Sequence, residues 1–525
     1  METERSCIGS MIFSLFCTSK GHRVLLAKKE LGFRRFCSVV KSKFSNVDKE
    51  VVIVKEYGLF INGEWKVTDE KIGVVSKATG SEVALISVAG EAEVKDAVDA
   101  AEKAFKTINI EPYRRYEILM KASRILMEKQ KQMAEFLVQE VGKPIKEAMA
   151  EVARAEQTLI LSAEEAKRMT GEMVPLEGAP GCDNRWAFTM RIPVGVVCAI
   201  TPFNFPLNLA CHKIGPALAA GNSVVYKPAT VTPLSAVLLC EIFAEAGLPD
   251  GYLNLLTGSG AKLGKLLTEE QRIGFYSFTG SPAVGKTLLQ NAGFRRVALE
   301  LGSNSANIVH QDADIKLTAG LCVKHAFANA GQVCISCQRV YVHRSAYKEF
   351  CDEAAIHTEQ LVMGNPFDPA TDIGPMISEA EAVRAEEWVN EAISQGARVL
   401  AGGKRRGTWF EPTILTDVQH GMNIVSMEAF APVFSIVPYD EIEEAIDLVN
   451  ASIYGLQAGV FTNSLEIARM CAMKIETGGV IFNDGATFRT DNMPYGGIKE
   501  SGIGREGPQY AVKEMTEEKL IVFKF

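Results

Sequence analysis

Apolar and polar residues alternate along the middle of the chain with two different periods. Short β-branched apolar runs predict buried strands at 194–200, 223–227, 253–256, 274–278 and 296–301. Apolar residues at helical spacing predict helices between them, at 207–220, 233–246, 261–267 and 285–291. Strands that alternate with helices in this way are typical of a parallel, doubly wound sheet. We therefore expect an α/β fold.

The flanking segments extend this pattern in both directions. Residues 57–65 predict a hairpin on the turn Asn62-Gly63. Helical spacing follows at 91–106, 112–141 and 144–169, and then come a turn-rich stretch at 171–184 and a strand-like run at 186–191. A second α/β series runs from 306 to about 483, and a strand-like run closes the chain at 520–525. The pattern indicates two α/β parts with additional β segments.

Composition narrows the class of protein. The chain has 525 residues, 47% hydrophobic and 23% charged, which is the ordinary balance of a globular protein. The first 49 residues carry ten Lys/Arg against four Asp/Glu, so they hold +6 and the remainder holds −14 of the net −8. An acidic body argues against a nucleic-acid partner or a polybasic membrane surface. No apolar run reaches the roughly 18 residues that a membrane span needs.

The N-terminal residues 1–49 stand apart from the pattern. They are basic, which suggests an organelle transit peptide, but Glu2, Glu4 and Glu30 are unusual in such peptides. An extension, or a start codon placed too early with Met11 as another candidate, is the alternative. We expect a cytoplasmic protein, or an organellar one if this segment is a transit peptide.

The twelve cysteines and seven histidines do not form a recognisable framework. The cysteines have no repeating spacing, which favours reduced thiols in a reducing compartment. There is no HExxH motif and no pair of metal-ligand clusters. We expect no metal site.

The segment from Gly280 to Thr287 satisfies the P-loop pattern GxxxxGK[ST], between a strand-like and a helical stretch. A P-loop normally lies near the first strand of its domain, whereas several α/β units precede this one. No clean candidate exists for the acidic residue that would hold magnesium. A Gly-Ser turn at a helix N-terminus favours a phosphate, whether in a triphosphate or a pyrophosphate. A P-loop phosphotransferase is one alternative.

Cys334 and Cys337 form a lone CxxC, which is weak evidence for zinc or for a redox motif. A nucleophilic cysteine needs partners. Glu300 ends an apolar strand 34 positions before Cys334, and Asn204 lies in the aromatic loop 201–206 after a buried strand. Ligands bind at that edge of a parallel sheet. A solvated strand end for Glu300 and a turn former for Asn204 are the alternatives.

Several ordered motifs carry a resemblance to the NAD(P)-dependent aldehyde dehydrogenase superfamily, from about Phe60 to the C-terminus. The motifs lie at 201–206, 227–229, 278–281, 299–302, 331–334, 428–433 and 493–497. The resemblance implies a doubly wound cofactor domain (50–172 and 194–302), an α/β catalytic domain (303–486) and an oligomerisation arm (173–193 and 487–525). The arm implies a homodimer or homotetramer. A catalytically silent relative with the same fold is a further alternative.

The resemblance also implies roles for single residues. Cys334 would be the nucleophile that forms a thiohemiacetal and then a thioester. The side-chain amide of Asn204 would stabilise the oxyanion together with the Cys334 backbone N–H. Glu300 would activate the water that hydrolyses the thioester, so that the product is a free acid and not a coenzyme A ester. The resemblance also implies that Lys227 belongs to the catalytic residues.

The cofactor would be NAD or NADP. The residues implied in binding it are Thr201, Pro202, Phe203, Lys227, Thr230, Thr279, Gly280, Ser281, Gly285, Leu301, Glu428 and Phe430. Relatives that use only NAD usually carry Glu at the position of Thr230, where it repels a 2′-phosphate. Thr230 removes that repulsion and favours NADP.

The substrate is a small aldehyde in this interpretation. The loop from Asn483 to Met493 would line its entrance, with Arg489 and Phe488 as candidate contacts. Arg489 could pair with an anionic or hydroxylated substrate, or be a surface arginine that pairs with Asp491. The motifs are most similar to the branch of lactaldehyde and non-phosphorylating glyceraldehyde-3-phosphate dehydrogenases. Val333 stands where phosphate-specific relatives often have Arg, which favours a small 2-hydroxyaldehyde such as lactaldehyde.

Overall fold

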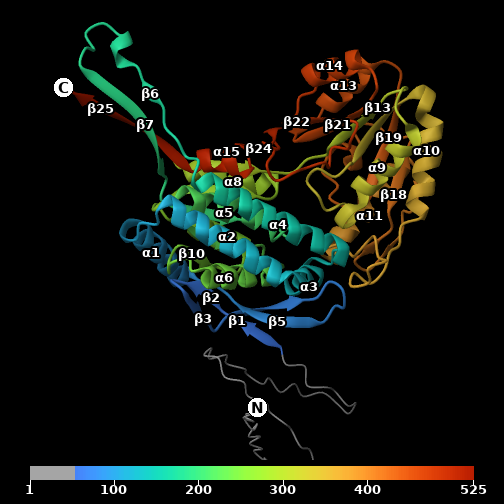
Figure 1. Cartoon of the computed structure of the whole chain (residues 1–525). Coiled ribbons are helices and arrows are strands. Elements are labelled where there is room, and N and C mark those ends of the chain that lie inside the picture. Colours follow the sequence, from blue (N-terminus) through green and yellow to red (C-terminus); the bar gives the residue numbers. More distant parts are fainter. Residues whose placement is uncertain (1–53) are drawn as a thin grey trace, which may run out of the picture. The chain divides into compact units, whose positions relative to one another are not determined.

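The computed structural model describes residues 54–525 (Figure 1). Residues 1–49, the predicted extension, lie outside the described residues. Among residues 54–525, no helix is long and apolar enough to cross a membrane.

The first large sheet has eight strands and confirms the predicted doubly wound arrangement. Its order is β24 (Gly502–Ile503), β12 (Arg296–Glu300), β11 (Ile273–Thr279), β8 (Val196–Ile200), β9 (Ser223–Lys227), β10 (Leu253–Leu255), β2 (Leu59–Ile61) and β3 (Glu64–Lys66). The five strands from β12 to β10 are mutually parallel. All five residues of β8 are buried, as expected for a central strand that is covered on both faces.

Strands β2 and β3 form the predicted hairpin. Asn62 and Gly63 both have positive φ, 52° and 79°, which a type I′ turn requires. A separate three-stranded sheet consists of β1 (Lys55–Tyr57), which precedes the hairpin in sequence, and of β5 (Glu82–Ser87) and β4 (Lys71–Val75), which follow it.

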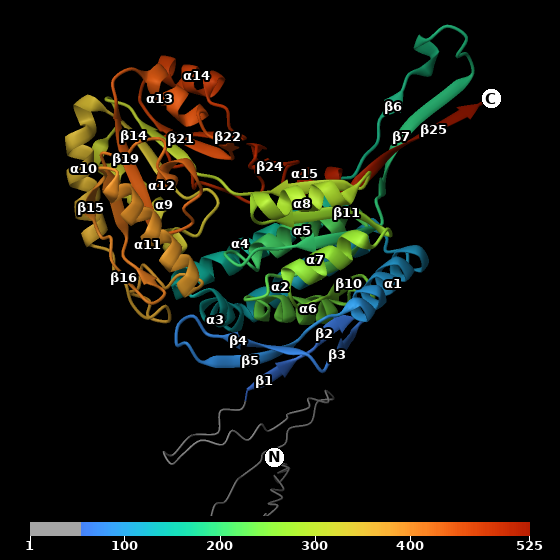
Figure 2. The ribbon, with the colours of Figure 1, turned by 180° about the vertical axis from the view of Figure 1, so that it is seen from behind.

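Helices cover both faces of the first sheet (Figures 1 and 2). One layer consists of α1 (Glu91–Thr107), α7 (Gly260–Glu269) and α8 (Pro282–Ala292). The other consists of α5 (Asn208–Ala220) and α6 (Leu234–Ala246), with α2 (Pro112–Glu128), α3 (Gln130–Val141), α4 (Ile145–Ala166) and α15 (Pro508–Glu514) packed outside them. The single helix predicted at 112–141 is wrong, because the chain breaks at Lys129. Residues 128–132 are all polar, so no apolar side chain packs on the core at this point to keep the two helices continuous.

The second large sheet carries the predicted second α/β series. Its order is β15 (Arg398–Ala401), β18 (Thr413–Thr416), β19 (Val433–Tyr439), β14 (Arg339–His343), β13 (Ala306–Val309), β21 (Gln457–Phe461) and β22 (Gly479–Phe482). Helices α9 (Ile315–Phe327), α10 (Arg344–Glu359) and α11 (Glu379–Ser394) share one apolar core with it. Helices α13 (Ile442–Asn450) and α14 (Leu465–Lys474) share the core of the opposite face.

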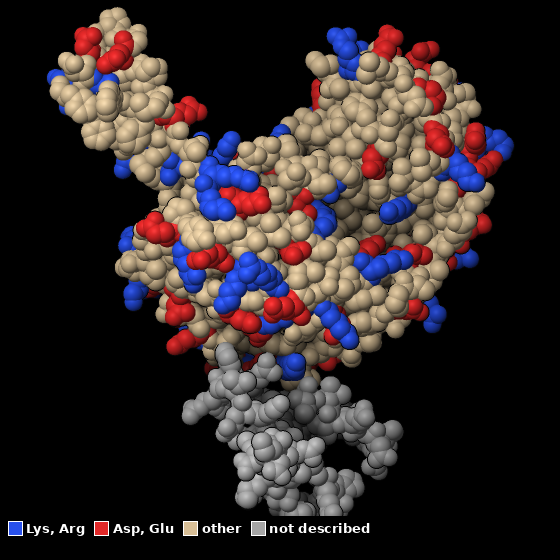
Figure 3. All heavy atoms as spheres, in the orientation of Figure 1, with Lys and Arg blue, Asp and Glu red and all other residues tan. Residues whose placement is uncertain are grey.

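A three-stranded sheet of β25 (Thr516–Lys524), β7 (Arg185–Pro193) and β6 (Met173–Val174) projects from the first half (Figures 1 and 2). Many of its apolar side chains are exposed, among them Met173, Trp186, Leu520 and Phe525. β24 and α15, which precede β25, pack instead on β12 and α5. Charges of both signs are interspersed on the face that Figure 3 shows, so that face offers no extended basic surface.

Candidate active site

Four of the predicted site residues lie at one edge of the first sheet, because parallel strands place their carboxyl ends together. Glu300 ends β12 in register with Thr279, the last residue of β11. Lys227 ends β9 in register with Ile200 of β8, and Thr201 follows directly. This register brings together residues that are up to 99 positions apart in the sequence.

The loop that follows β8 is held by a buried ion pair that the sequence interpretation missed. Lys143 Nζ lies 2.5 Å from Glu151 Oε2 and donates to the carbonyl oxygen of Asn204 at 2.7 Å. Both side chains are fully buried. Glu151 Oε1 accepts the backbone N–H groups of Leu207 and Asn208, at the start of α5. Helix α4 therefore fixes the loop that carries Asn204.

The same helix holds the loop that carries Cys334. Glu147 of α4 accepts the backbone N–H of Asn329 at 2.9 Å. Asn329, Ala330 and Gly331 have consecutive positive φ values of 49°, 54° and 69°. A Cβ at Gly331 would clash with the carbonyl oxygen of Ala431. Such backbone strain persists only where the surroundings enforce it and is frequent at functional sites.

The two loops meet at the candidate nucleophile. Asn204 Nδ2 donates to the carbonyl oxygen of Gln332, two residues before Cys334, at 2.9 Å. The Cys334 Sγ lies 3.0 Å from the hydroxyl oxygen of Tyr495. Burial raises the pKa of the Cys334 thiol to about 11, although Tyr495 and Arg489 act in the opposite direction. The structure thus brings Asn204 next to the Cys334 loop.

Glu300 is buried, with 4% of its surface exposed, so the solvated strand end is contradicted. Neither carboxylate oxygen has a hydrogen-bond partner among residues 54–525. Burial, and then the nearby Glu506, raise the pKa of Glu300 well above its ordinary value. A Cβ at Gly496 would lie 2.8 Å from Glu300 Oε1, so this carboxylate reaches the residue that follows Tyr495. Cys334 and Glu300 therefore border the same two-residue segment.

Arg489 is not a surface residue paired with Asp491. Its side chain is 7% exposed, its Nη2 lies 3.0 Å from Glu506 Oε2, and its guanidinium stacks 3.6 Å from the ring centroid of Tyr495. Asp491 is bound instead by Arg154 Nη2 at 2.8 Å and His212 Nε2 at 2.9 Å. The other candidate substrate contact, Phe488, is 42% exposed.

Glu506 joins two cations in this buried region. Lys213 Nζ lies 2.7 Å from its Oε1. Burial alone would raise the pKa of Glu506, but Lys213 and Arg489 lower it to about 2. Its carboxylate therefore stays ionised between two cations, Lys213 and Arg489.

The Gly280 turn runs from the end of β11 into α8. The Gly280 N–H donates to the Glu300 carbonyl oxygen, and Ser281 is the N-cap of α8 without a side-chain cap bond. A Cβ at Gly285 would press on Leu301. Lys286, which would be the P-loop lysine, is 56% exposed and pairs with Glu500 at 2.7 Å.

The remaining predicted cofactor residues line neighbouring loops. Burial lowers the pKa of Lys227 to about 8, and its Nζ donates to the Pro228 carbonyl oxygen. Thr230 Oγ1 donates to the Gly258 carbonyl oxygen at 2.8 Å. The ring of Phe203 meets that of Phe430 edge-on at 5.8 Å.

Glu428 and Pro202 complete the predicted cofactor set. Glu428 Oε1 accepts the Ser303 N–H at 3.0 Å, and burial raises the pKa of Glu428 to about 7. Pro202 lies in the loop after β8 and is half-buried.

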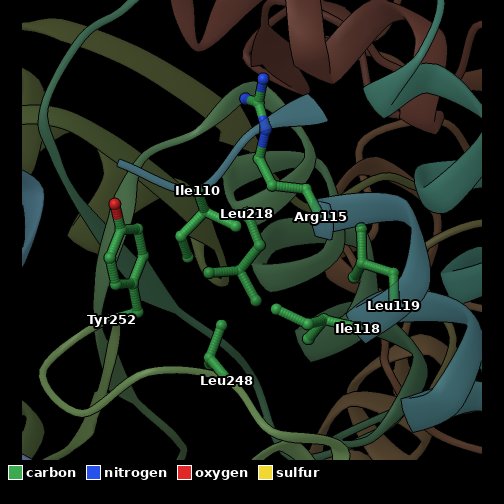
Figure 4. Close-up of a pocket in the computed structure, with 7 residues that line it drawn as sticks. All are labelled: Ile110, Arg115, Ile118, Leu119, Leu218, Leu248 and Tyr252. Atoms are coloured by element: carbon green, nitrogen blue, oxygen red, sulfur yellow. The ribbon is translucent and has the colours of Figure 1, made fainter. Parts of the chain in front are cut away.

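Two other kinds of site that could carry chemistry are a metal-ligand cluster and a pocket apart from the residues above. Within the described part of the chain, no cluster of three or more His, Cys, Asp or Glu side chains could hold a metal ion. A small pocket between α2 and α5 is lined by Ile110, Ile118, Leu119, Leu218 and other mainly apolar residues, and the guanidinium of Arg115 points away from its centre (Figure 4). None of the predicted site residues lines that pocket.

Known proteins are similar to this chain over most of its length. Residues 65–521 match the model of the aldehyde dehydrogenase family. The chain is 55% identical to 3-sulfolactaldehyde dehydrogenase of Priestia aryabhattai over 469 residues, which are 89% of this chain and 98% of the relative. It is 42% identical to lactaldehyde dehydrogenase of Methanococcus maripaludis over 88% of this chain and 99% of the relative.

A solved structure extends the comparison to the fold. The structure of glyceraldehyde-3-phosphate dehydrogenase from Methanocaldococcus jannaschii, complexed with NADP, superposes with a TM-score of 0.84 at 40% identity. The match covers 87% of this chain and 100% of that one. The P-loop alternative is not favoured by any of these matches. The chain belongs to the aldehyde dehydrogenase family.

Proposed function

We propose that this chain oxidises a small 2-hydroxyaldehyde to its carboxylic acid with NAD(P), and that NADP is the preferred cofactor. One observation carries the proposal. The Cys334 thiol, the Asn204 amide and the unpartnered Glu300 carboxylate gather around the loops 204, 332–334 and 495–496. These are the nucleophile, the oxyanion donor and the base that acyl transfer to water requires.

The first step is attack of the Cys334 thiolate on the aldehyde carbon, which gives a thiohemiacetal oxyanion. An amide nitrogen carries two N–H donors. Asn204 uses one on the Gln332 carbonyl oxygen, which fixes the amide plane, and keeps the other for the oxyanion. One such donor lowers the barrier by about 3–4 kcal/mol.

NAD(P), when bound, supplies the acceptor of the hydride that leaves the thiohemiacetal carbon. The donor set of this chain fits such a cofactor. Lys227 is a buried ammonium that donates to the Pro228 carbonyl oxygen and has spare N–H groups for ribose hydroxyls. Ser281 leaves backbone N–H groups of α8 free of a side-chain cap, which suits a pyrophosphate.

Hydrolysis of the Cys334 thioester needs a base. Glu300 removes a proton from water, the hydroxide adds to the acyl carbon, and the thiolate leaves. The raised pKa of Glu300 suits a group that takes a proton in one step and releases it later. The presence of this base supports a free acid as the product.

The cofactor preference rests on Thr230. No carboxylate stands at that position to repel a 2′-phosphate, and the solved relative from Methanocaldococcus jannaschii is complexed with NADP. The preference for NADP over NAD is measured by the ratio of the kcat/KM values for the two cofactors.

The substrate class rests on the relatives and on Arg489. The 55% identical relative is named for 3-sulfolactaldehyde, which is a 2-hydroxyaldehyde with an anionic group, and the next for lactaldehyde. Arg489 is a buried cation close to the Cys334 partner Tyr495, and its Nε has no partner among the described residues. An anionic tail on the substrate would therefore meet favourable charge.

The experiment is a panel of lactaldehyde, 3-sulfolactaldehyde, glyceraldehyde 3-phosphate and succinic semialdehyde, each with NAD and with NADP. We expect the 2-hydroxyaldehydes to give the largest kcat/KM, with NADP above NAD, measured as reduced cofactor absorbance. Full activity in Cys334→Ser, or no turnover of any aldehyde, would refute the proposal.

Three further assignments belong to the proposal. The exposed apolar side chains of β7 and β25 suit pairing with a second copy of the chain, as a homodimer or homotetramer. The three-part domain division remains a prediction. So does a cytoplasmic location.

A further inference from the structure

Within residues 54–525, the side chain of Tyr495 makes one hydrogen bond, and its partner is the candidate nucleophile. Its hydroxyl oxygen lies 3.0 Å from Cys334 Sγ. The ring is 3% exposed and packs in an apolar cluster with Val333, Ile335 and Leu456. No other side chain of residues 54–525 is hydrogen-bonded to this sulfur.

The direction of this bond follows from the protonation states. A thiolate has no proton, so once Cys334 ionises only the phenol can donate. Burial raises the pKa of Tyr495 well above its ordinary value, so the phenol keeps its proton when the thiol has lost its own. The Tyr495 hydroxyl is therefore a donor that faces the sulfur in its reactive state.

The groups around Cys334 and Tyr495 give the thiolate little net stabilisation, so the hydrogen bond from the Tyr495 hydroxyl matters. Burial disfavours a thiolate at Cys334 most, and the Glu428 and Glu300 carboxylates disfavour it further. Arg489 favours it, but Glu506 pairs with that guanidinium and partly neutralises it. The guanidinium also stacks on the Tyr495 ring, which strengthens the hydroxyl as a donor.

We propose that Tyr495 is a further catalytic residue, whose hydroxyl donates a hydrogen bond to the Cys334 thiolate. The bond stabilises the nucleophile before attack and the same sulfur when it leaves the acyl carbon during hydrolysis. This inference rests on the proposed function only in giving Cys334 that role. The hydrogen bond itself can be tested without turnover.

The size of the effect follows from general values. A hydrogen bond to a charged group contributes about 1.5–3 kcal/mol, so its loss raises the thiol pKa by about one to two units. A higher thiol pKa leaves a smaller fraction of reactive thiolate near pH 8, but each thiolate is more nucleophilic, with a slope of about 0.4–0.5 against pKa. The alkylation rate therefore falls only about 3-fold to 15-fold.

The test is the rate of Cys334 alkylation by iodoacetamide in the full chain, followed on the Cys334 peptide by mass spectrometry. Because burial raises the Cys334 thiol pKa to about 11, rates are compared from about pH 6.5 to about 9, below that pKa, where the ratio of variant to wild-type rate reports the change in thiol pKa. Tyr495→Phe removes the hydroxyl and keeps the ring. Tyr439→Phe is the matched control, because its buried hydroxyl bonds His310 in the second sheet and not the sulfur.

We expect the alkylation rate of Cys334 to fall about 3-fold to 15-fold in Tyr495→Phe, which corresponds to a thiol pKa raised by about one to two units, and to stay unchanged in Tyr439→Phe. An unchanged or faster rate in Tyr495→Phe would overturn the inference, because the hydroxyl would then accept from the thiol or not interact. Tyr495→Met also lacks the hydroxyl and fills the space flexibly, and it decides the question if the Phe variant does not fold.

The outcome is separable from that of the proposed function. If Cys334→Ser abolishes aldehyde oxidation while Tyr495→Phe leaves the alkylation profile unchanged, only the role of Tyr495 fails. If Cys334→Ser keeps full activity, the proposed function fails, whatever the alkylation profile shows.

Discussion

Replacing Lys143 with Met should destabilise the protein strongly, because Lys143 is one half of a buried ion pair. Both Lys143 and Glu151 have side chains with 0% exposure. The Met side chain has a similar length but cannot neutralise Glu151 or donate to the Asn204 carbonyl oxygen. Glu151 would keep only the backbone N–H groups of Leu207 and Asn208.

The expected loss is about 3–5 kcal/mol of unfolding free energy, the usual range when one member of a buried pair is removed. Part of this loss should be recovered in the double variant Lys143→Met with Glu151→Gln. The Gln carbonyl oxygen can still accept the two backbone N–H groups, and no uncompensated charge remains. The double variant should therefore be more stable than Lys143→Met alone.

The measurement is urea-induced unfolding followed by far-ultraviolet circular dichroism, with all variants under one set of conditions. The matched control is Lys146→Met, three residues further along the chain at the start of α4. Lys146 pairs with Asp372 at the surface with 45% of its side chain exposed, so its loss should change stability by about 0–1 kcal/mol. The reasoning is refuted if Lys143→Met is as stable as Lys146→Met, or if the two losses at Lys143 and Glu151 simply add.

The other predictions concern the chemistry, the cofactor, a loop and the arm. Glu300→Gln should form about one reduced cofactor per subunit in a burst and then turn over about 10²–10⁴-fold more slowly in stopped-flow absorbance. Since burial raises the pKa of Glu300, wild-type turnover should fall as the pH drops through that raised pKa, and Glu300→Gln should lose this dependence; a steady rate without a burst would contradict the base role. Thr230→Glu should lower kcat/KM for NADP far more than for NAD in initial-rate assays, and equal losses would show that this residue does not face the 2′-phosphate. Gly331→Ala should abolish activity, because φ is +69° and the new Cβ would clash with Ala431; folded, active protein by circular dichroism and assay would contradict this. Leu520→Glu places a charge on the exposed face of β25 and should lower the mass seen in light scattering, unless the arm makes no subunit contact.

Much of the architecture follows from local patterns. The strands from β8 to β12, the helices between them and the Asn62-Gly63 hairpin lie where the apolar spacing and the turn residues predict them. Because each of these features depends on a few neighbouring residues, the sequence alone is sufficient to find them. The position of Glu300 at the end of a strand, and its alignment with Thr279 at one sheet edge, follow from the same α/β rule.

The environment of each reactive group was decided only by the tertiary structure. The sequence left a solvated strand end open as an alternative for Glu300, and a surface pair with Asp491 for Arg489, whereas both residues are buried. Tyr495 lies 161 positions from the sulfur that it contacts, and Lys143 lies 61 positions from the carbonyl that it holds. Burial and the identity of a distant partner depend on how whole layers pack against each other. That packing does not produce a recognisable pattern among neighbouring residues in the sequence. The chain sequence therefore determines which chemical groups are present and where the strands end, while packing sets their charge states and their partners.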